Sequence, residues 1–329
     1  MQIEPIVFQL QKTLKQSLRQ HARYLLAVSG GADSLALAHA CAALQRQGWG
    51  TYSVCHVEHG LRGEESLRDM RLVQQFCVQQ GLPCCVKPVA VRKLAASEQL
   101  SVEAAARRLR YSALREAAKA VGAAAIVTAH HQGDQAETVL LRLLRGAGLD
   151  GLAGMRKQSG DILRPLLGVT RAELEAYCAA VGISYCFDST NADTHYTRNR
   201  VRLDLLPKLA ADYNPDIVPT LARTAQLLAR DAAFLTQTAG ESFAAIARQS
   251  ADSISLNSAA LLALHEAVRL RVLRMAYFKL SSRELDYERT LALEALCVRR
   301  SGGKLIQLPG AVTVTYKNKQ LIFLKQKSS

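Results

Sequence analysis

The segment that most constrains this chain is Ser29–Ser34, which has the sequence Ser-Gly-Gly-Ala-Asp-Ser. It lies where an apolar run, residues 24–28, gives way to the pattern of a helix. A strand, a glycine turn and a helix N-terminus in succession present backbone N–H groups and a positive dipole end to an anion. The segment contains no lysine, so it differs from the Walker P-loop, which ends in Lys-Ser/Thr. It therefore predicts a phosphate-binding turn of another kind.

Asp33 is the residue of this turn that a phosphate site does not explain. A carboxylate would repel a nucleotide unless a cation such as Mg²⁺ stood between them, so Asp33 predicts a ligand for a metal or for a second substrate. The alternative is that the segment only caps a helix, since Ser, Asp and Gly are common capping residues.

Short apolar runs alternate with helical patterns through the first two-thirds of the chain. The runs are residues 24–28, 51–57, 83–89 and 124–129, and the helical patterns between them are 33–48, 65–81 and 101–122. This alternation predicts an α/β fold with a doubly wound parallel sheet. Ligands bind beyond the carboxyl ends of such strands, where polar residues gather at 29–31, 56–62 and 128–131. The polar groups should therefore meet at one edge of the sheet.

The pattern changes near residues 212–219, where Asn214-Pro215 and Pro219 interrupt the periodicity. We expect a catalytic domain over residues 1–212 and a smaller domain over 213–329. From Thr220 the second domain reads as mostly helical. It ends in short strands at 304–308, 312–316 and 321–324.

Charge and cysteine content restrict the partners and the compartment. Lysine and arginine number 42 against 28 acidic residues, a formal charge of +14, which favours a polyanionic partner such as RNA. Arginines cluster at 198–202 and again at 269–300. The alternative is a protein that is merely basic. Residues 1–23 lack the apolar core of a signal peptide, and no stretch is long enough to cross a bilayer, so we expect a cytoplasmic protein without membrane contact. The eight cysteines include no Cys-x-x-Cys pair, which argues for reduced thiols and against a zinc ribbon or an iron–sulfur cluster.

Two motifs imitate known sites without their context. Gly146–Gly151 matches the dinucleotide pattern but follows a helix rather than a strand, so we interpret it as a flexible loop. His56-Val57-Glu58 with Pro83-Cys84 resembles the opening of a deaminase zinc motif, but position 87 is lysine. A transition metal could still use the imidazoles and carboxylates at 56, 58, 59, 130 and 131, although both groups also suit a nucleotide site. We expect no zinc.

Residues 130–138 follow a buried strand and open a helix. Asp134 and Glu137 lie three residues apart in its first turn, where they could hold a cation or simply cap the helix, and capping competes more strongly for Glu137. Residues 103–111 form an arginine-rich helical stripe that is by itself more typical of a solvated face.

These segments, in this order and together with Asp188–Asn191 and Tyr196–Arg202, resemble the tRNA(Ile)-lysidine synthetases of the N-type ATP pyrophosphatase (PP-loop) superfamily. The resemblance spans roughly residues 20–210. It implies a fold like that of the adenine nucleotide alpha hydrolases and an ATP- and Mg²⁺-dependent reaction. The wobble cytidine of tRNA(Ile), in a CAU anticodon, is adenylated with loss of diphosphate, and free L-lysine then displaces AMP to form lysidine.

The resemblance also implies roles for individual residues. Catalytic roles fall to Asp33, Asp134 and Arg198, with Asp33 and Asp134 at the Mg²⁺ or lysine site. ATP would be bound by Ser29, Gly30, Gly31, Ala32, Asp33, Ser34 and His56. Phosphate or tRNA would be contacted by Arg107, Arg108, Asp188, Asn191, Asn199, Arg200 and Arg202.

Two departures from the family pattern affect these expectations. Gly133 stands where relatives usually carry an acidic or amide residue, so a metal contact from that position would be lost or supplied by water. Longer relatives continue into a further domain that grips tRNA, and we expect the present chain to make its tRNA contacts without it. A tRNA thiolase of the same superfamily and a non-catalytic RNA-binding relative remain alternatives, and a homodimer is left open.

Overall fold

The computed structural model describes residues 5–186, 197–300 and 303–326. The chain forms two compact units, Met1–Ala229 and Arg230–Ser329, and the division falls within helix α11 (Ile217–Ile246). The change in sequence pattern that suggests a boundary comes earlier, at Asp212.

The first unit is built on a six-stranded sheet with the strand order β3-β2-β1-β4-β6-β5. All neighbouring strands are parallel except β5 and β6, and Leu25 in β1 pairs with Ser53 in β2 and Ile126 in β4. The sheet confirms the doubly wound parallel fold predicted from the alternating pattern. Its strands are β1 (Arg23–Ala27), β2 (Thr51–Glu58), β3 (Cys84–Pro88), β4 (Ala125–Val127), β5 (Gln158–Ser159) and β6 (Ile162–Leu163).

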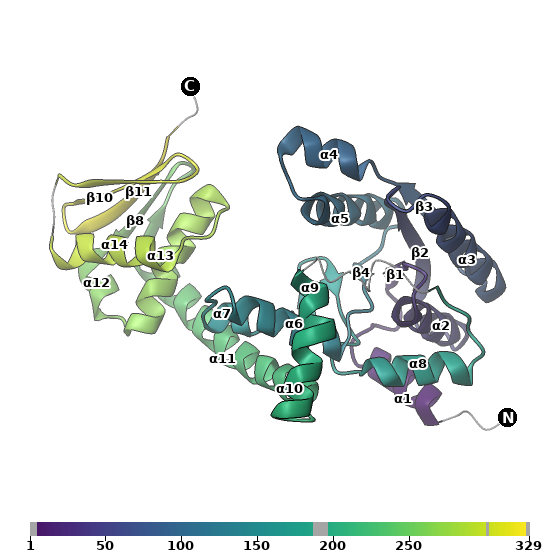
Figure 1. Cartoon of the computed structure of the whole chain (residues 1–329). Coiled ribbons are helices and arrows are strands. Elements are labelled where there is room, and N and C mark those ends of the chain that lie inside the picture. Colours follow the sequence, from purple (N-terminus) through teal and green to yellow (C-terminus); the bar gives the residue numbers. More distant parts are fainter. Residues whose placement is uncertain (1–4, 187–196, 301–302, 327–329) are drawn as a thin grey trace. The chain divides into compact units, whose positions relative to one another are not determined.

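Helices connect the strands and continue beyond the sheet (Figure 1). A π-helical turn at Val201–Leu205, labelled η2, joins α9 to α10. The other helices up to the middle of the chain are α1 (Pro5–Lys15), α2 (Ala32–Arg46), α3 (Glu64–Gln80), α4 (Val91–Glu98), α5 (Val102–Ala120), α6 (Gln132–Leu143), α7 (Leu149–Leu152), α8 (Arg171–Ala180), α9 (Thr197–Arg200) and α10 (Leu206–Asp212).

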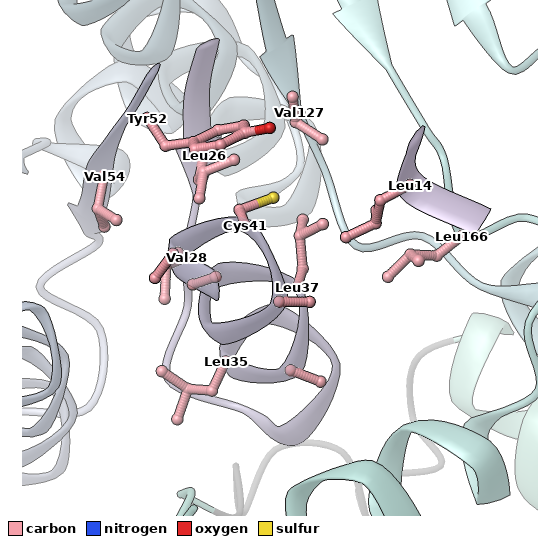
Figure 2. Packing of buried hydrophobic residues seen from close by; sticks show 14 of the residues in the cluster. Leu14, Leu26, Val28, Leu35, Leu37, Cys41, Tyr52, Val54, Val127 and Leu166 are labelled. Carbon is pink, nitrogen blue, oxygen red and sulfur yellow. The ribbon is translucent and has the colours of Figure 1, made fainter. Parts of the chain in front are cut away.

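Hydrophobic clusters bury both faces of this sheet. On one face, Leu26 and Val54 from the strands pack with residues of α1, α2, α3 and α8, including Leu14 and Leu37 (Figure 2). On the other face, Leu25 of β1 packs against Leu114 and its neighbours on α5. Burial on both faces explains why these strands are continuous apolar runs rather than alternating ones. The two clusters thus fix the carboxyl ends of the strands, where the polar turns begin.

The second unit is a five-stranded antiparallel sheet with the order β7-β8-β11-β10-β9. Val314 and Phe323 on its central strands pack in one cluster with Val272 and Leu293 of helices α13 and α14. The last three strands match the predicted ones, whereas the first two lie where the pattern predicts helix. The elements are β7 (Ala247–Gln249), β8 (Ser253–Asn257), α12 (Ser258–Ala263), α13 (Glu266–Ser281), α14 (Tyr287–Val298), β9 (Leu305–Leu308), β10 (Val312–Lys317) and β11 (Gln320–Lys325).

Among the described residues, no helix combines the length and the apolar character that crossing a membrane requires.

Candidate active site

A cavity of about 660 Å³ lies in the first unit, at the carboxyl ends of β1, β2 and β4. The three polar turns that the sequence placed at one edge of the sheet all contribute to its wall, so that expectation is confirmed. Helix α5 and the α9–η2 segment also contribute to the lining. Of the residues proposed from the sequence, those in the wall are Ser29, Gly31, Ala32, Asp33, Ser34, His56, Asp134, Arg198, Asn199 and Arg202.

The phosphate turn is organised around the hydroxyl of Ser34. Its Oγ accepts hydrogen bonds from the N–H groups of Ser29 (3.2 Å) and Gly30 (3.3 Å) and donates one to the carbonyl of Gly31 (3.0 Å). Gly30 has φ +99°, a conformation that side chains disfavour, and an added Cβ would lie 3.5 Å from Cγ2 of Val73. The position favours glycine because of its backbone conformation, whereas the contact with α3 would be an ordinary van der Waals one.

Helix α2 begins without a side-chain cap, since its N-cap is Gly31. The first N–H groups of a helix have no partner within the helix, and here no capping oxygen satisfies them, so they suit an anion in the cavity. The capping interpretation of the segment is therefore wrong for Asp33, which lies inside the first turn. Its Oδ1 atom is buried and has no hydrogen-bond partner among the described residues. Burial raises the pKa of the Asp33 carboxyl, although His131 and Arg171 act in the opposite direction.

His131 connects the turn after β4 to Asp33. Its Nδ1 atom accepts the N–H of Gly133 (3.0 Å), so in the neutral imidazole the proton lies on Nε2. Nε2 lies 3.6 Å from Oδ2 of Asp33 and 3.7 Å from Oδ2 of Asp134. One imidazole thus stands between the two carboxylates proposed for catalysis.

Asp134 and Glu137 exchange the roles that their positions suggested. Asp134 caps the helix, because its Oδ2 accepts the backbone N–H of His131 (3.0 Å). Glu137 is 2% exposed and binds two arginines, with Oε2 2.6 Å from Nε of Arg198 and Oε1 2.5 Å from Nε of Arg202. Glu137 received no functional role from the sequence, because helix capping explained it there. Its burial on the core side of α6, which a capping glutamate does not need, argues against that explanation.

Arg198 also reaches Asp134, with NH2 2.6 Å from Oδ1. Burial alone would raise the pKa of Asp134, but His131 and Arg198 hold it below the usual carboxylate range. Burial would likewise lower the pKa of Arg198, but Asp134 and Glu137 keep it above its usual value. Asp134, Glu137, Arg198 and Arg202 form a charged network beside the cavity.

Three histidines at the cavity, His56, His59 and His130, are shifted toward their neutral forms. His56 hydrogen-bonds through Nδ1 to the carbonyl of Val28 (2.9 Å), and burial lowers its pKa and that of His59. Burial lowers the pKa of His130 to about 4, and its Nδ1 lies 2.8 Å from the hydroxyl of Thr128. Neutral imidazoles are suited to donate or accept hydrogen bonds with ribose, base or phosphate.

Two of the arginines on α5, those at 107 and 108, do not contribute to the cavity. Arg107 and Arg108 are exposed and do not line the cavity; Arg108 pairs with Glu98 of α4, and Arg107 lies over the ring of Tyr111. Arg110 lines the cavity instead, together with Tyr111. Residues four apart share a helix face, and Arg110 lies on the same face as the buried Leu114, a relation that the sequence contained.

Other proposed positions lie outside the cavity wall or outside the described residues. Arg200 is exposed, and its guanidinium contacts the hydroxyl of Thr197 (3.4 Å). Asp188 and Asn191 fall outside the described residues. Gly30 supports the turn without lining the cavity, and residues 149–152 of the glycine-rich segment form the short helix α7 rather than a loop.

Further cavity residues were given no role from the sequence. Arg62, which belongs to the polar segment 56–62, donates from NH2 to Oδ2 of the buried Asp69 (2.8 Å), and both line the cavity beside Tyr185 and Arg171. Asp69 lies on α3, Arg171 begins α8 and Tyr185 follows α8, where the sequence offers isolated residues rather than a motif.

One carboxylate of the cavity is suited to hold a cation. Across residues 5–186, 197–300 and 303–326, no three His, Cys, Asp or Glu side chains are arranged to hold a metal ion. Asp33 nevertheless fits Mg²⁺, which prefers carboxylate oxygens and takes its other ligands from water and substrate phosphates, because its buried Oδ1 has no other partner. Asp134 fits less well, since Arg198 and the N–H of His131 already occupy its oxygens.

Comparison with known proteins identifies the family of the chain. The PP-loop domain family model matches residues 4–209. The chain is 37% identical over 317 residues to the tRNA(Ile)-lysidine synthase of Nitratidesulfovibrio vulgaris, covering 91% of each chain. It is 32% identical over 292 residues to the tRNA(Ile)-lysidine synthase of Clostridium perfringens, covering 88% of this chain and 62% of that one. Several relatives are longer, and the chain spans about three-fifths of their length. Among solved structures, the U34-tRNA thiolase NcsA from Methanococcus maripaludis matches with a TM-score of 0.59 at 14% identity, covering 69% of this chain and 80% of that one, which shows a shared fold.

Proposed function

Since the chain belongs to the PP-loop family and, within it, to the tRNA(Ile)-lysidine synthases, we propose that it joins L-lysine to the wobble cytidine of tRNA(Ile) with a CAU anticodon. ATP would adenylate the base with loss of diphosphate, and the lysine amine would displace AMP. The domains, the cytoplasmic location and the residue roles given from the sequence are part of the same proposal, with the corrections described above.

The observation that carries the proposal is the cavity at the carboxyl ends of β1, β2 and β4. It combines an uncapped helix N-terminus with a carboxylate, Asp33, whose Oδ1 has no hydrogen-bond partner among the described residues. A carboxylate placed inside a phosphate turn is costly unless a cation or an amine joins it. Both are needed in a reaction between ATP and lysine.

The N–H groups of the Ser29–Ser34 turn and of the start of α2 would bind the phosphates. Mg²⁺ held by Asp33 would supply charge neutralisation of the phosphates. Adenylation needs no protein nucleophile, because the carbonyl oxygen of cytosine attacks the α-phosphate and diphosphate leaves. The chain's contribution is therefore to position the reactants and to stabilise the charge that develops on diphosphate.

Arg110 and Arg202 are the cavity cations best placed for that second task. Arg202 is oriented by Glu137, whereas Arg110 faces the cavity from α5. Neutral His56 would contact the nucleotide as a hydrogen-bond partner rather than as a charge. Exposed arginines outside the cavity, such as Arg107 and Arg200, would bind the tRNA backbone with release of counterions.

The carboxylates Asp33 and Asp134 both line the cavity and suit the lysine ammonium group. His131 presents Nε2–H between Asp33 and Asp134, so it holds the two carboxylates apart and orients them. Arg198 neutralises part of the charge on Asp134 and Glu137. An incoming amine would therefore meet Asp33 as the carboxylate with a free oxygen.

The experiment is incubation of the protein with ATP, Mg²⁺, labelled lysine and separate tRNA transcripts. Incorporation into tRNA(Ile) with a CAU anticodon, but not into the methionine tRNA with the same anticodon, is expected. ATP–pyrophosphate exchange without lysine incorporation would indicate another PP-loop modification such as thiolation. Binding of tRNA with no exchange would indicate a non-catalytic relative.

A further inference from the structure

The guanidinium of Arg110 is held differently from those of Arg198 and Arg202. The latter two bind the buried carboxylate of Glu137, which fixes their positions and also cancels part of their charge. Within the described part of the chain, no carboxylate forms an ion pair with Arg110. Its Cζ atom lies instead over the ring of Tyr111, 5.1 Å from the ring centre. Arg110 therefore lines the cavity beside an aromatic face rather than beside an acid.

The ring of Tyr111 is a firm support. Tyr111 is 8% exposed and packs in the hydrophobic cluster that contains Leu25 of β1, Cys55 of β2 and Ile126 of β4. The cavity lies at the carboxyl ends of these three strands. Because side chains in a densely packed core move little, the position of the ring is set by the sheet.

Two further guanidinium groups lie near the same ring. Arg107 and Arg115, four residues before and after Tyr111, have their Cζ atoms 5.2 and 6.0 Å from its centre. Arg115 is paired with Asp161, with Nε 2.8 Å from Oδ2, and Arg107 is exposed, so that water screens its charge. Of the three arginines, Arg110 is the one in the cavity wall.

An aromatic ring and a carboxylate hold a cation with different consequences. A carboxylate brings a full negative charge, which reduces the attraction of the pair for a phosphate. A ring attracts the cation through its quadrupole and leaves the net positive charge unchanged. Arginine is a long and flexible side chain, so it must be held in place to act on a reacting group. Tyr111 meets this need without neutralising Arg110.

We propose that Tyr111 is a positioning residue, whose ring holds Arg110 at the cavity with its charge undiminished so that Arg110 can stabilise the charge that develops on diphosphate. This role rests on the ATP chemistry proposed above for the same cavity. The hydroxyl of Tyr111 is not needed for it, because Oη is buried and has no hydrogen-bond partner among the described residues. The ring and the hydroxyl can therefore be tested separately.

Steady-state ATP–pyrophosphate exchange by the full-length protein, with tRNA(Ile) present, measures the effect. Tyr111→Phe keeps the ring and should retain the wild-type kcat within about twofold. Tyr111→Leu should lower kcat on the order of tenfold with little change in the KM for ATP, because Arg110 acts mainly in the transition state. Arg115→Ala is the matched control: it removes another guanidinium from the same ring, but one that lies outside the cavity wall.

A double-mutant cycle shows whether Tyr111 acts through Arg110. In the Arg110→Ala background, Tyr111→Leu should slow the exchange by less than about twofold more, since the group that it positions is already absent. A merely structural role of the ring would slow both backgrounds by the same factor. That result, or a Tyr111→Phe variant as slow as Tyr111→Leu, would overturn the proposal.

The contact itself is measurable without substrates. In a proton–nitrogen correlation spectrum, the Nε–H signal of Arg110, assigned by its loss in Arg110→Ala, should be displaced by the ring current of Tyr111. The displacement should persist in Tyr111→Phe and disappear in Tyr111→Leu. If Tyr111→Leu does not fold, an undisplaced signal in the wild type still overturns the proposal. A displaced signal in a wild type without exchange activity would contradict the proposed ligation and leave the contact established.

Discussion

The Nε2 atom of His131 lies 3.6 Å from Oδ2 of Asp33, which joins the turn after β4 to the phosphate turn after β1. Because Nδ1 of the same ring accepts the N–H of Gly133, the proton on Nε2 is directed at the carboxylates. His131 and Asp33 thus bring two different strand–helix connections together at the cavity.

Replacing Asp33 with asparagine tests the role of its free oxygen. Asp33→Asn should keep the fold but lower lysine incorporation by roughly a thousandfold, because an oriented metal contact acts mainly on the transition state. Steady-state incorporation at several Mg²⁺ concentrations measures this, with circular dichroism as a control for folding. Near-normal turnover by a folded variant would remove Asp33 from the mechanism.

Gly133 tests the orientation of His131. In Gly133→Ala the new Cβ would lie 2.8 Å from Cε1 of His131, so the imidazole must move, and we expect lysine incorporation to fall about tenfold or more. Gly168→Ala is the matched control, because its Cβ meets no atom within 4 Å. Equal activities of the two variants would show that the imidazole is not held in place for catalysis.

Glu137 tests the buried charge network. Glu137→Gln removes the charge shared by Arg198 and Arg202, and loss of one partner from a buried pair typically costs about 3 kcal/mol of unfolding free energy. Glu116→Gln provides the control, since Glu116 pairs with Lys87 at the surface and should cost less than about 1 kcal/mol. Urea denaturation measures both. A destabilisation of the same size in the two variants would contradict the assigned burial effect.

Arg110 and Arg108 lie two residues apart on α5 but on different surfaces. Arg110→Ala should slow ATP–pyrophosphate exchange by about a hundredfold, as expected for loss of a charged donor at the reacting phosphates. Arg108→Ala should leave the exchange unchanged, because that side chain pairs with Glu98 outside the cavity. The reverse order of effects would restore the assignment made from the sequence.

His130 predicts a loss of stability in mild acid. An unfolded histidine takes up its proton as the pH falls through about 6.5, whereas burial lowers the folded pKa to about 4. The unfolded state thus binds more protons between these pH values. As the pH is lowered, the free energy of unfolding should decrease by up to about 1.4 kcal/mol per pH unit before levelling off. His56 and His59 act in the same direction.

Thermal or urea unfolding across pH 4 to 7 measures the effect. His130→Asn should flatten part of the slope, and His21→Gln, at an exposed position, is the control. An unchanged slope in His130→Asn would assign the acid sensitivity elsewhere.

The sequence predicted the parallel sheet because its strands are buried on both faces and appear as uninterrupted apolar runs. It missed β7, whose residues Ala-Arg-Gln carry no strand signal and continue the pattern of α11. It also missed β5, which is only Gln158–Ser159 and pairs with β6 alone. Strands this short are defined by their neighbours rather than by their own composition.

The site was predicted where a motif lies on one turn, as at Ser29–Ser34. The sequence could not separate the arginines of α5, because the phase of the helix rather than composition decides that Arg110 lines the cavity while Arg107 and Arg108 do not. Charge clusters are no better guide: in the cluster at 269–300, Nε of Arg269 lies 2.5 Å from Glu294 and its NH1 donates to the carbonyl of Leu264. Such contacts within the fold do not show in the sequence pattern.

The π-helical turn at Val201–Leu205 has a consequence for changes in chain length. The i→i+5 hydrogen bonds of a π-turn accommodate one residue more than an α-helix would, while side chains four apart still lie on nearly one face. Arg198 and Arg202 can therefore both reach Glu137. Deleting one residue there would restore an α-helix and improve its regularity, yet it would rotate one arginine by about 100° relative to the other elements. A more regular helix here would therefore separate two arginines that now share one carboxylate.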